Sequence, residues 1–66
     1  MMVKINGKPE EVHATMVMDL LKAKGIDPQM VAVELNDKMI ERDHLASTPV
    51  QDGDSLEFLF YMGGGR

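Results

Sequence analysis

The side chains that most often carry chemistry in proteins are few and scattered in this sequence. It has no cysteine and only two histidines, His13 and His44, which lie far apart in the chain. A chain without cysteine has no thiol nucleophile, no disulfide and no zinc finger. Neither histidine has a paired carboxylate at a ligand spacing, so we expect surface histidines and no metal site. Asp52 and Asp54 flank Gly53, an arrangement more typical of a turn than of a catalytic carboxylate pair.

The most distinctive chemical feature is a stretch of bare main chain, the triplet from Gly63 to Gly65 that precedes Arg66. Glycine has no Cβ, so such a segment can pass through a narrow channel and bring its backbone close to another molecule. For an arbitrary protein, a frayed end without function is the alternative interpretation. Here the triplet follows the last predicted strand, so we expect residues 63–66 to form a flexible arm on a rigid domain, residues 1–62.

The composition is that of one small globular domain. The chain has 66 residues, of which 44% are hydrophobic and 27% charged, and its net charge is −4. This length leaves little interior for a closed catalytic pocket. The acidic excess argues against nucleic-acid binding and favours partners with a basic surface. No segment is apolar for long enough to span a bilayer, and the first residues do not resemble a signal peptide, so we expect a cytoplasmic monomer that does not bind membranes.

A β-hairpin is predicted at the start of the chain. Val3 and Ile5 alternate with polar or exposed positions, which is the period of a half-buried strand. The pair Asn6-Gly7 favours a type I′ turn, in which both central residues have positive φ. Pro9 cannot donate a ladder hydrogen bond, so the returning strand is expected at a sheet edge.

One helix of nine or ten residues is predicted next. Thr15 is its expected N-cap, with the hydroxyl accepting a hydrogen bond from the first turn. Val17, Leu20 and Leu21 follow at helical spacing and predict the buried face. Gly25 is the expected end of the helix, because a residue with positive φ commonly terminates one.

The second half of the chain predicts further strands, at residues 30–35, 39–41 and 55–61. A single helical turn at Asp43-His44-Leu45 is expected to close one end of the core. In the last strand, one face carries Leu56, Phe58 and Phe60, and the other carries Glu57, Leu59 and Tyr61. Two strands, a helix and then two or three strands predict an α+β fold with one main helix across one face of a four- to five-stranded sheet.

The opposite face of that sheet has no predicted cover. Leu59 and Tyr61 are therefore expected at the surface, and together with Met62 they are predicted to bind partner proteins, since aromatic and methionine side chains are enriched in interfaces. Scattered exposed apolar residues without function are the alternative. The seven methionines are expected either to fill gaps in a small core or to form an adaptable contact surface.

The order and spacing of these segments resemble the ThiS-type sulfur carriers, which belong to the β-grasp, ubiquitin-like superfamily. The resemblance covers essentially the whole chain and rests on Arg42, the terminal glycines and the segments 3–8, 15–21, 31–36 and 52–58. It implies a mixed β-grasp sheet in which the first and last strands pair in parallel. It also implies a carrier and not an enzyme.

The same resemblance implies that the chemistry takes place at Gly65. An E1-like adenylating enzyme, using ATP and magnesium, would convert the Gly65 carboxylate into an acyl-adenylate. A persulfide on a sulfur donor protein would then leave a thiocarboxylate at this position. The chain itself would bind no cofactor and no metal. The implied acceptor is thiazole synthase, on the route to thiamine.

Arg66 departs from the family pattern, in which the chain ends at the glycines. With Arg66 attached, Gly65 carries an amide that cannot be adenylated. Three interpretations are open: a C-terminal peptidase removes Arg66, the residue was added in cloning, or the protein acts by non-covalent binding alone. Removal would hint at a sulfur carrier for homocysteine or cysteine synthesis. A ubiquitin-like modifier joined through Gly65 to a target lysine is a further alternative.

Overall fold

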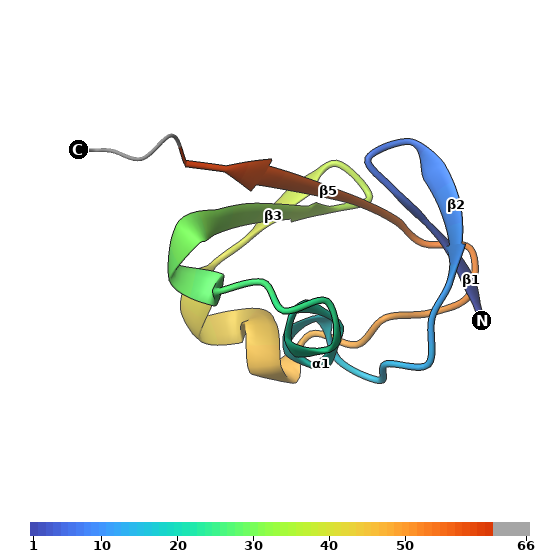
Figure 1. Cartoon of the computed structure of the whole chain (residues 1–66), viewed down its shortest axis with the longest axis horizontal. Helices are drawn as coiled ribbons and strands as arrows, with labels where there is room; N and C mark the ends of the chain where they lie inside the picture. The colour runs from blue at the N-terminus through green and yellow to red at the C-terminus, as the bar shows by residue number, and fades with distance from the viewer. Residues whose placement is uncertain (62–66) are drawn as a thin grey trace.

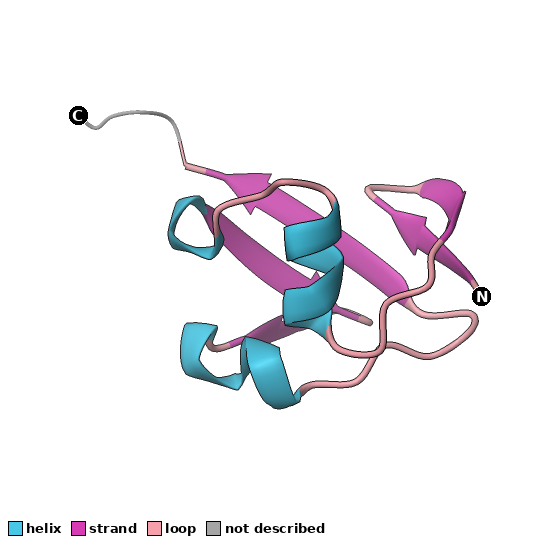
Figure 2. Cartoon of the chain, turned by 60° about the horizontal axis from the view of Figure 1, so that its bottom comes forward, coloured by secondary structure: helices cyan, strands magenta, loops and turns pink. Residues whose placement is uncertain are grey.

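The computed structural model describes residues 1–61, which form a five-stranded sheet with helical segments on one face (Figures 1 and 2). The strands are β1 (Met2–Ile5), β2 (Lys8–Glu11), β3 (Val31–Leu35), β4 (Lys38–Ile40) and β5 (Ser55–Phe60). The helical segments are the α-helix α1 (Val17–Ala23) and the 3-10 helices η1 (Pro28–Met30) and η2 (Arg42–Ser47). The predicted boundary between domain and tail, after residue 62, lies outside the described residues.

The strands lie in the order β2-β1-β5-β3-β4. β1 and β5, the first and last strands of the chain, pair in parallel at the centre, while the other neighbouring pairs are antiparallel. This arrangement confirms the predicted α+β, β-grasp fold and its parallel central pair. β2, which contains Pro9, lies at a sheet edge as expected.

The first turn also connects the hairpin to the last strand. Asn6 and Gly7 have φ of 50° and 84°, in agreement with the predicted type I′ turn. The Asn6 side-chain oxygen accepts a hydrogen bond from the Phe58 N–H at 2.8 Å, and its amide donates to the Phe58 carbonyl at 3.4 Å. The side chain of Asn6 thus extends the β1–β5 ladder beyond Ile5 and holds β5 in place.

Helix α1 begins one residue later than predicted and has seven residues instead of nine or ten. The N-cap is Met16, so the prediction of Thr15 was wrong. The Asp19 carboxylate explains the difference, because it accepts from the Met16 N–H at 3.2 Å and from the Thr15 hydroxyl at 3.0 Å. Thr15 therefore donates to a side chain and does not cap the backbone. Gly25, with φ of 71°, follows the end of the helix as predicted.

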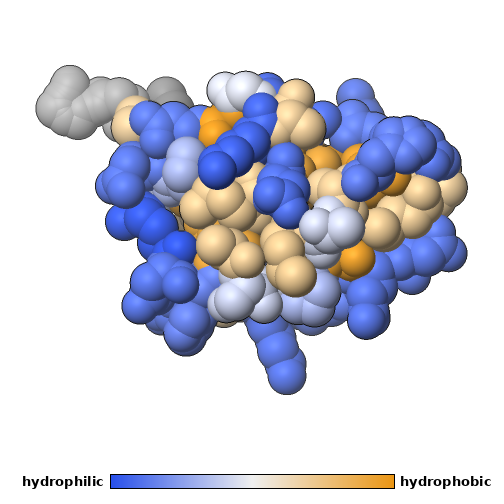
Figure 3. All heavy atoms as spheres, turned by 90° about the horizontal axis from the view of Figure 1, so that it is seen from below, coloured by the Kyte–Doolittle hydropathy of each residue, from blue (hydrophilic) through white to orange (hydrophobic). Residues whose placement is uncertain are grey.

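The core lies between the sheet and the helical segments. Leu20 and Leu21 of α1 belong to one buried cluster with Leu56 and Phe58 of β5. Leu45 of η2 is 2% exposed and closes one end of this cluster, which confirms the predicted helical turn. Figure 3 shows the molecule from the side of the helical segments, where apolar residues appear at the centre among hydrophilic ones.

Candidate functional site

β5 is the element that positions the C-terminal tail. It lies at the centre of the sheet, hydrogen-bonded to β1 on one side and to β3 on the other. Immediately after the strand, the Tyr61 N–H donates to the carbonyl of Met30 at 3.1 Å. The chain therefore leaves the domain from a strand that is fixed on both sides, and it leaves at the end opposite the N-terminus (Figure 1).

Two residues predicted to bind partners lie exposed at this end. Leu59 is 46% exposed and Tyr61 is 53% exposed, as expected for a sheet face without cover. Leu59 lies directly opposite Ala32 of β3. The other residues predicted for the site lie outside the described residues: Met62 of the partner-binding surface, Gly63 and Gly64 of the tail, the adenylation site Gly65, and Arg66.

Phe60 was expected on the core face with Leu56 and Phe58, but it is 55% exposed. It is the last residue of β5 and lies outside the buried cluster, although Val31, opposite it on β3, still belongs to that cluster. Met30, next to Val31, is also exposed. The end of β5 thus presents large apolar side chains beyond Leu59 and Tyr61, and the period of the strand alone could not reveal this.

The uncovered face of the sheet is acidic next to Leu59. Glu57 of β5 lies directly opposite Glu34 of β3. Like charges in this position repel each other, and neither carboxylate forms an ion pair within residues 1–61. A basic side chain on a partner would relieve this repulsion, which agrees with the preference for a basic partner inferred from the net charge.

The other groups singled out in the sequence have structural or surface positions. His13 and His44 are exposed, and within residues 1–61 no three His, Cys, Asp or Glu side chains gather as metal ligands. Asp54 accepts hydrogen bonds from the Gln51 N–H at 2.7 Å and from the Asn36 side chain at 3.0 Å. Asp54 therefore holds a turn, as predicted for this segment, and is not part of a catalytic carboxylate pair.

The end of the sheet that is remote from Tyr61 has its own polar contacts. A hydrogen bond from the Met1 ammonium at 2.8 Å, together with its positive charge, lowers the pKa of Glu11. Asp52 accepts from the Met2 N–H at 2.8 Å. These contacts fix the start of β1. Among residues 1–61, no helix has the length and apolar character needed to cross a membrane.

Comparison with known proteins identifies the family. The model of the ThiS family matches residues 3–65 of this chain. The chain belongs to the ThiS family. The matched region includes all three glycines of the predicted tail and stops before Arg66.

Similar proteins of known name agree with this family. The sulfur carrier protein ThiS of Thermus thermophilus is 31% identical over 97% of this chain and 100% of its own length. The crystal structure of the thiamine biosynthesis protein ThiS from Geobacter metallireducens has 42% identity and a TM-score of 0.84, over 98% of this chain and 100% of that one. The ThiS membership and the β-grasp fold predicted from the sequence are thereby confirmed.

Other relatives are longer proteins. A thiazole synthase of Paramagnetospirillum magneticum is 38% identical over 98% of this chain, and one of Magnetococcus marinus is 33% identical over 100% of it. This chain spans about a fifth of the length of these two proteins, 20% and 21%. A ThiS-like segment and the remainder of a thiazole synthase are thus parts of one polypeptide in these relatives.

Proposed function

We propose that this member of the ThiS family is a sulfur carrier of thiamine biosynthesis and that it holds sulfur as a thiocarboxylate on Gly65. The observation that carries the proposal is the family match, which extends through the glycines to residue 65. It is supported by the position of β5, which directs the chain out of the domain from the centre of the sheet. In this proposal partner enzymes recognise the folded domain, and the reactive atom lies at the end of the tail.

The chemistry requires activation because a carboxylate is a poor acyl donor. An adenylating enzyme uses ATP and magnesium to join the Gly65 carboxylate to AMP, and pyrophosphate leaves. A persulfide sulfur then attacks the acyl carbon and AMP leaves. A thiol cleaves the sulfur–sulfur bond of the product, which releases the thiocarboxylate. In this scheme the chain is a substrate of enzymes and binds neither ATP nor magnesium itself.

Removal of residue 66 precedes this chemistry. Adenylation needs a free carboxylate on Gly65, and Arg66 converts that group into an amide. A C-terminal peptidase is therefore a further partner of the carrier. The match to the ThiS family reaches Gly65 and does not include Arg66.

The enzymes that receive the tail dock on Leu59, Tyr61 and Met62. Leu59 and Tyr61 are about half exposed on the uncovered face of the sheet, immediately before the tail. Glu34 and Glu57 add negative charge beside Leu59, so the complementary surface is apolar with basic side chains. Thiazole synthase is the proposed sulfur acceptor, because its ThiS-like segment in two relatives is similar to this chain.

Intact-mass measurement on protein isolated from the native host tests this function. The expected mass is that of the chain without Arg66 and with one oxygen replaced by sulfur. The chain isolated from cells that lack the adenylating enzyme is the control, and it should carry no sulfur. Conjugates to lysine would instead indicate a ubiquitin-like modifier, and an unmodified chain that keeps Arg66 would indicate a non-covalent adaptor.

The acceptor is tested by supplying the thiocarboxylate form to purified thiazole synthase with its other substrates. Formation of the thiazole is the expected result. Transfer of sulfur to a precursor of homocysteine or cysteine, with no thiazole formed, would show that the carrier serves that other pathway.

Replacing Gly64 by alanine should slow adenylation about fivefold at saturating enzyme, while the fold stays intact. The reason is steric and conformational. A Cβ makes the tail wider, so it fits a narrow channel less easily, and it disfavours positive φ; together these effects cost about 1 kcal/mol. Single-turnover adenylation of a chain that ends at Gly65 measures the effect. Ser55→Ala, a small exposed change at the start of β5, is the control. Equal rates for Gly64→Ala and the parent chain would contradict the narrow-channel argument.

A further inference from the structure

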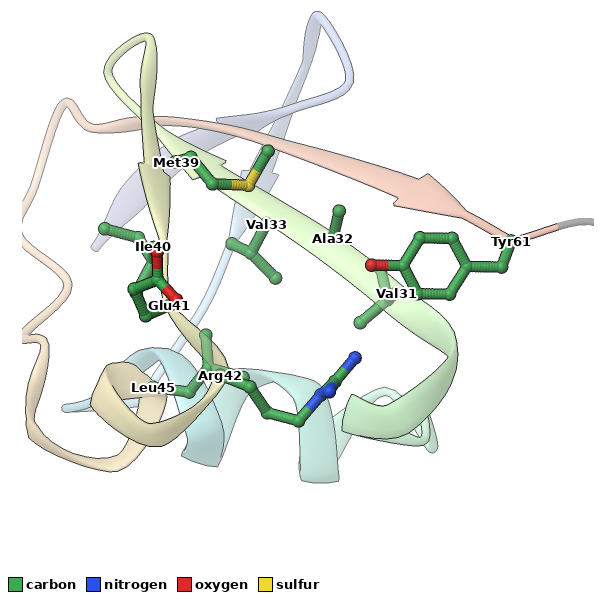
Figure 4. Close-up of a pocket in the computed structure, with 9 residues that line it drawn as sticks. All are labelled: Val31, Ala32, Val33, Met39, Ile40, Glu41, Arg42, Leu45 and Tyr61. Carbon is green, nitrogen blue, oxygen red and sulfur yellow. The ribbon is translucent and has the colours of Figure 1, made fainter.

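A pocket of about 240 Å³ lies beside the point where the tail leaves the domain. The pocket is lined by Tyr61, which directly follows β5, by Val31 and Ala32 of β3, by Arg42 of η2 and by apolar side chains of β4 (Figure 4). Three segments that are far apart in the sequence thus meet at one place. The pocket was not predicted from the sequence.

The pocket lies along a stretch of β3 that is paired with β5 on one side and, within residues 1–61, has no neighbouring strand on the other. β4 has only three residues, and its pairing with β3 ends at Val33 opposite Ile40. The antiparallel register would continue with Val31 opposite Arg42, but Arg42 already belongs to η2. The Tyr61 N–H donates a hydrogen bond to the carbonyl of Met30. In an antiparallel pair the N–H and C=O groups of every second residue face the same neighbouring strand, so those of Met30 and Ala32 point to β5. Those of Val31 consequently point to the opposite side, towards the pocket.

Two side-chain donors face the same end of this pocket. The Arg42 Nε–H donates to the carbonyl of Pro28 at 3.1 Å, which fixes the guanidinium, while its terminal nitrogens form no hydrogen bond within residues 1–61. The Tyr61 hydroxyl forms none with those residues either. Figure 4 shows both groups directed to the end beside Val31, whereas Glu41 lies at the other end beside Ile40.

We propose that this pocket binds the carboxylate of an aspartate or glutamate side chain of thiazole synthase. The guanidinium can bind a carboxylate through two parallel hydrogen bonds, and the Tyr61 hydroxyl supplies a third donor. Met39, Ile40 and Leu45 form an apolar wall for the methylene stem of the acidic residue. The free backbone groups of Val31 form a strand edge, and the main chain of the partner's acidic residue lies extended along this edge.

The choice of thiazole synthase follows from two relatives, thiazole synthases in which a segment similar to this chain belongs to the same polypeptide, together with the position of the pocket. It adjoins Tyr61, so an enzyme that encloses the tail also covers the pocket. The inference rests on the proposed function, in which thiazole synthase receives the sulfur. It adds one positively charged contact to a docking surface that is otherwise apolar and acidic.

The test is the dissociation constant between this chain and thiazole synthase of the same organism, measured by calorimetry. Arg42→Ala should raise the constant about tenfold, the range expected for the loss of hydrogen bonds to a charged group. The dissociation constant of Arg42→Lys should lie between those of the parent chain and Arg42→Ala, because an ammonium group keeps the charge but cannot form two parallel hydrogen bonds to a carboxylate. Lys22→Ala is the matched control: it removes one positive charge from an exposed position on α1, and it should leave the constant unchanged.

Equal effects of Arg42→Ala and Lys22→Ala would overturn the proposal, since they would reflect net charge alone. Circular dichroism checks that Arg42→Ala remains folded after losing its bond to Pro28. If it unfolds, Tyr61→Phe replaces it as the test, because this change removes only the hydroxyl. A constant that Tyr61→Phe leaves unchanged would then overturn the proposal.

The thiocarboxylate assay separates this proposal from the proposed function. If the parent chain delivers sulfur to thiazole synthase and Arg42→Ala binds as tightly as the parent, the pocket proposal fails and the carrier function stands. If the parent chain delivers no sulfur, the proposed function fails.

Discussion

Deleting Arg66 should convert a chain that cannot be adenylated into one that can. As long as residue 66 is attached, the carbonyl carbon of Gly65 is part of an amide and has no free carboxylate oxygen to attack the α-phosphate of ATP. The terminal carboxylate is then that of Arg66, about 3.5 Å farther along an extended tail and beside a long cationic side chain, so it does not take the place of the Gly65 carboxylate. ATP–pyrophosphate exchange by the adenylating enzyme of the same organism measures this step. We expect exchange above background only with the chain that ends at Gly65.

A chain that ends at Gly64 is the matched control for this experiment. It also has a free carboxylate, but its tail is shorter by one residue, about 3.5 Å when extended. It should support little exchange, because the carboxylate no longer reaches the bound nucleotide. Equal exchange by the chains with and without Arg66 would contradict the assignment of Gly65 as the reactive residue.

The elements with strong local signals were predicted well. Asn6-Gly7 fixes a type I′ turn through positive φ at two adjacent residues, and Gly25 ends a helix in the same way. The buried positions Leu56 and Phe58 follow from the two-residue period of β5. In each case the deciding interaction is contained within a few consecutive residues, so the sequence alone is sufficient.

The errors arose where a distant residue or a competing side chain decides. Thr15 was expected to cap α1, but the Asp19 carboxylate binds the Thr15 hydroxyl and the Met16 N–H instead. Phe60 follows the same period as Phe58, yet it is exposed at the last position of β5, while the buried cluster includes Val31 opposite it on β3 and not Phe60 itself. A local pattern predicts on which face of the sheet a residue lies, but it does not predict how much of that face the helical segments cover.

The candidate site was predictable only in part for the same reason. Leu59 and Tyr61 were recognisable because the two-residue period of the last strand places them on the face opposite to Leu56 and Phe58. The pocket was not recognisable, because Val31, Arg42 and Tyr61 come together only through the early end of β4 and the start of η2. Arg42 entered the sequence interpretation solely as part of the family resemblance.

Replacing Leu59 by asparagine should weaken binding to the adenylating enzyme about thirtyfold and leave the fold intact. An apolar side chain at the centre of a docking surface typically contributes about 2 kcal/mol when the partner removes it from water. In the free chain Leu59 is 46% exposed, so its loss should lower the free energy of unfolding by less than about 1 kcal/mol. Calorimetric titration and thermal unfolding measure the two quantities separately.

Met2→Asn is the matched control for this prediction. Met2 is 45% exposed, and the alternation of β1 places it on the same sheet face as Leu59, but at the end remote from the tail. Because the two substitutions are both neutral and remove similar exposed area, only the distance from the tail separates them. Equal weakening by both variants would mean that the enzyme recognises the whole apolar face, and a large loss of stability in Leu59→Asn would mean that Leu59 is a core residue. A loss of affinity confined to Leu59→Asn ties docking to the base of the tail, where the proposed function requires it.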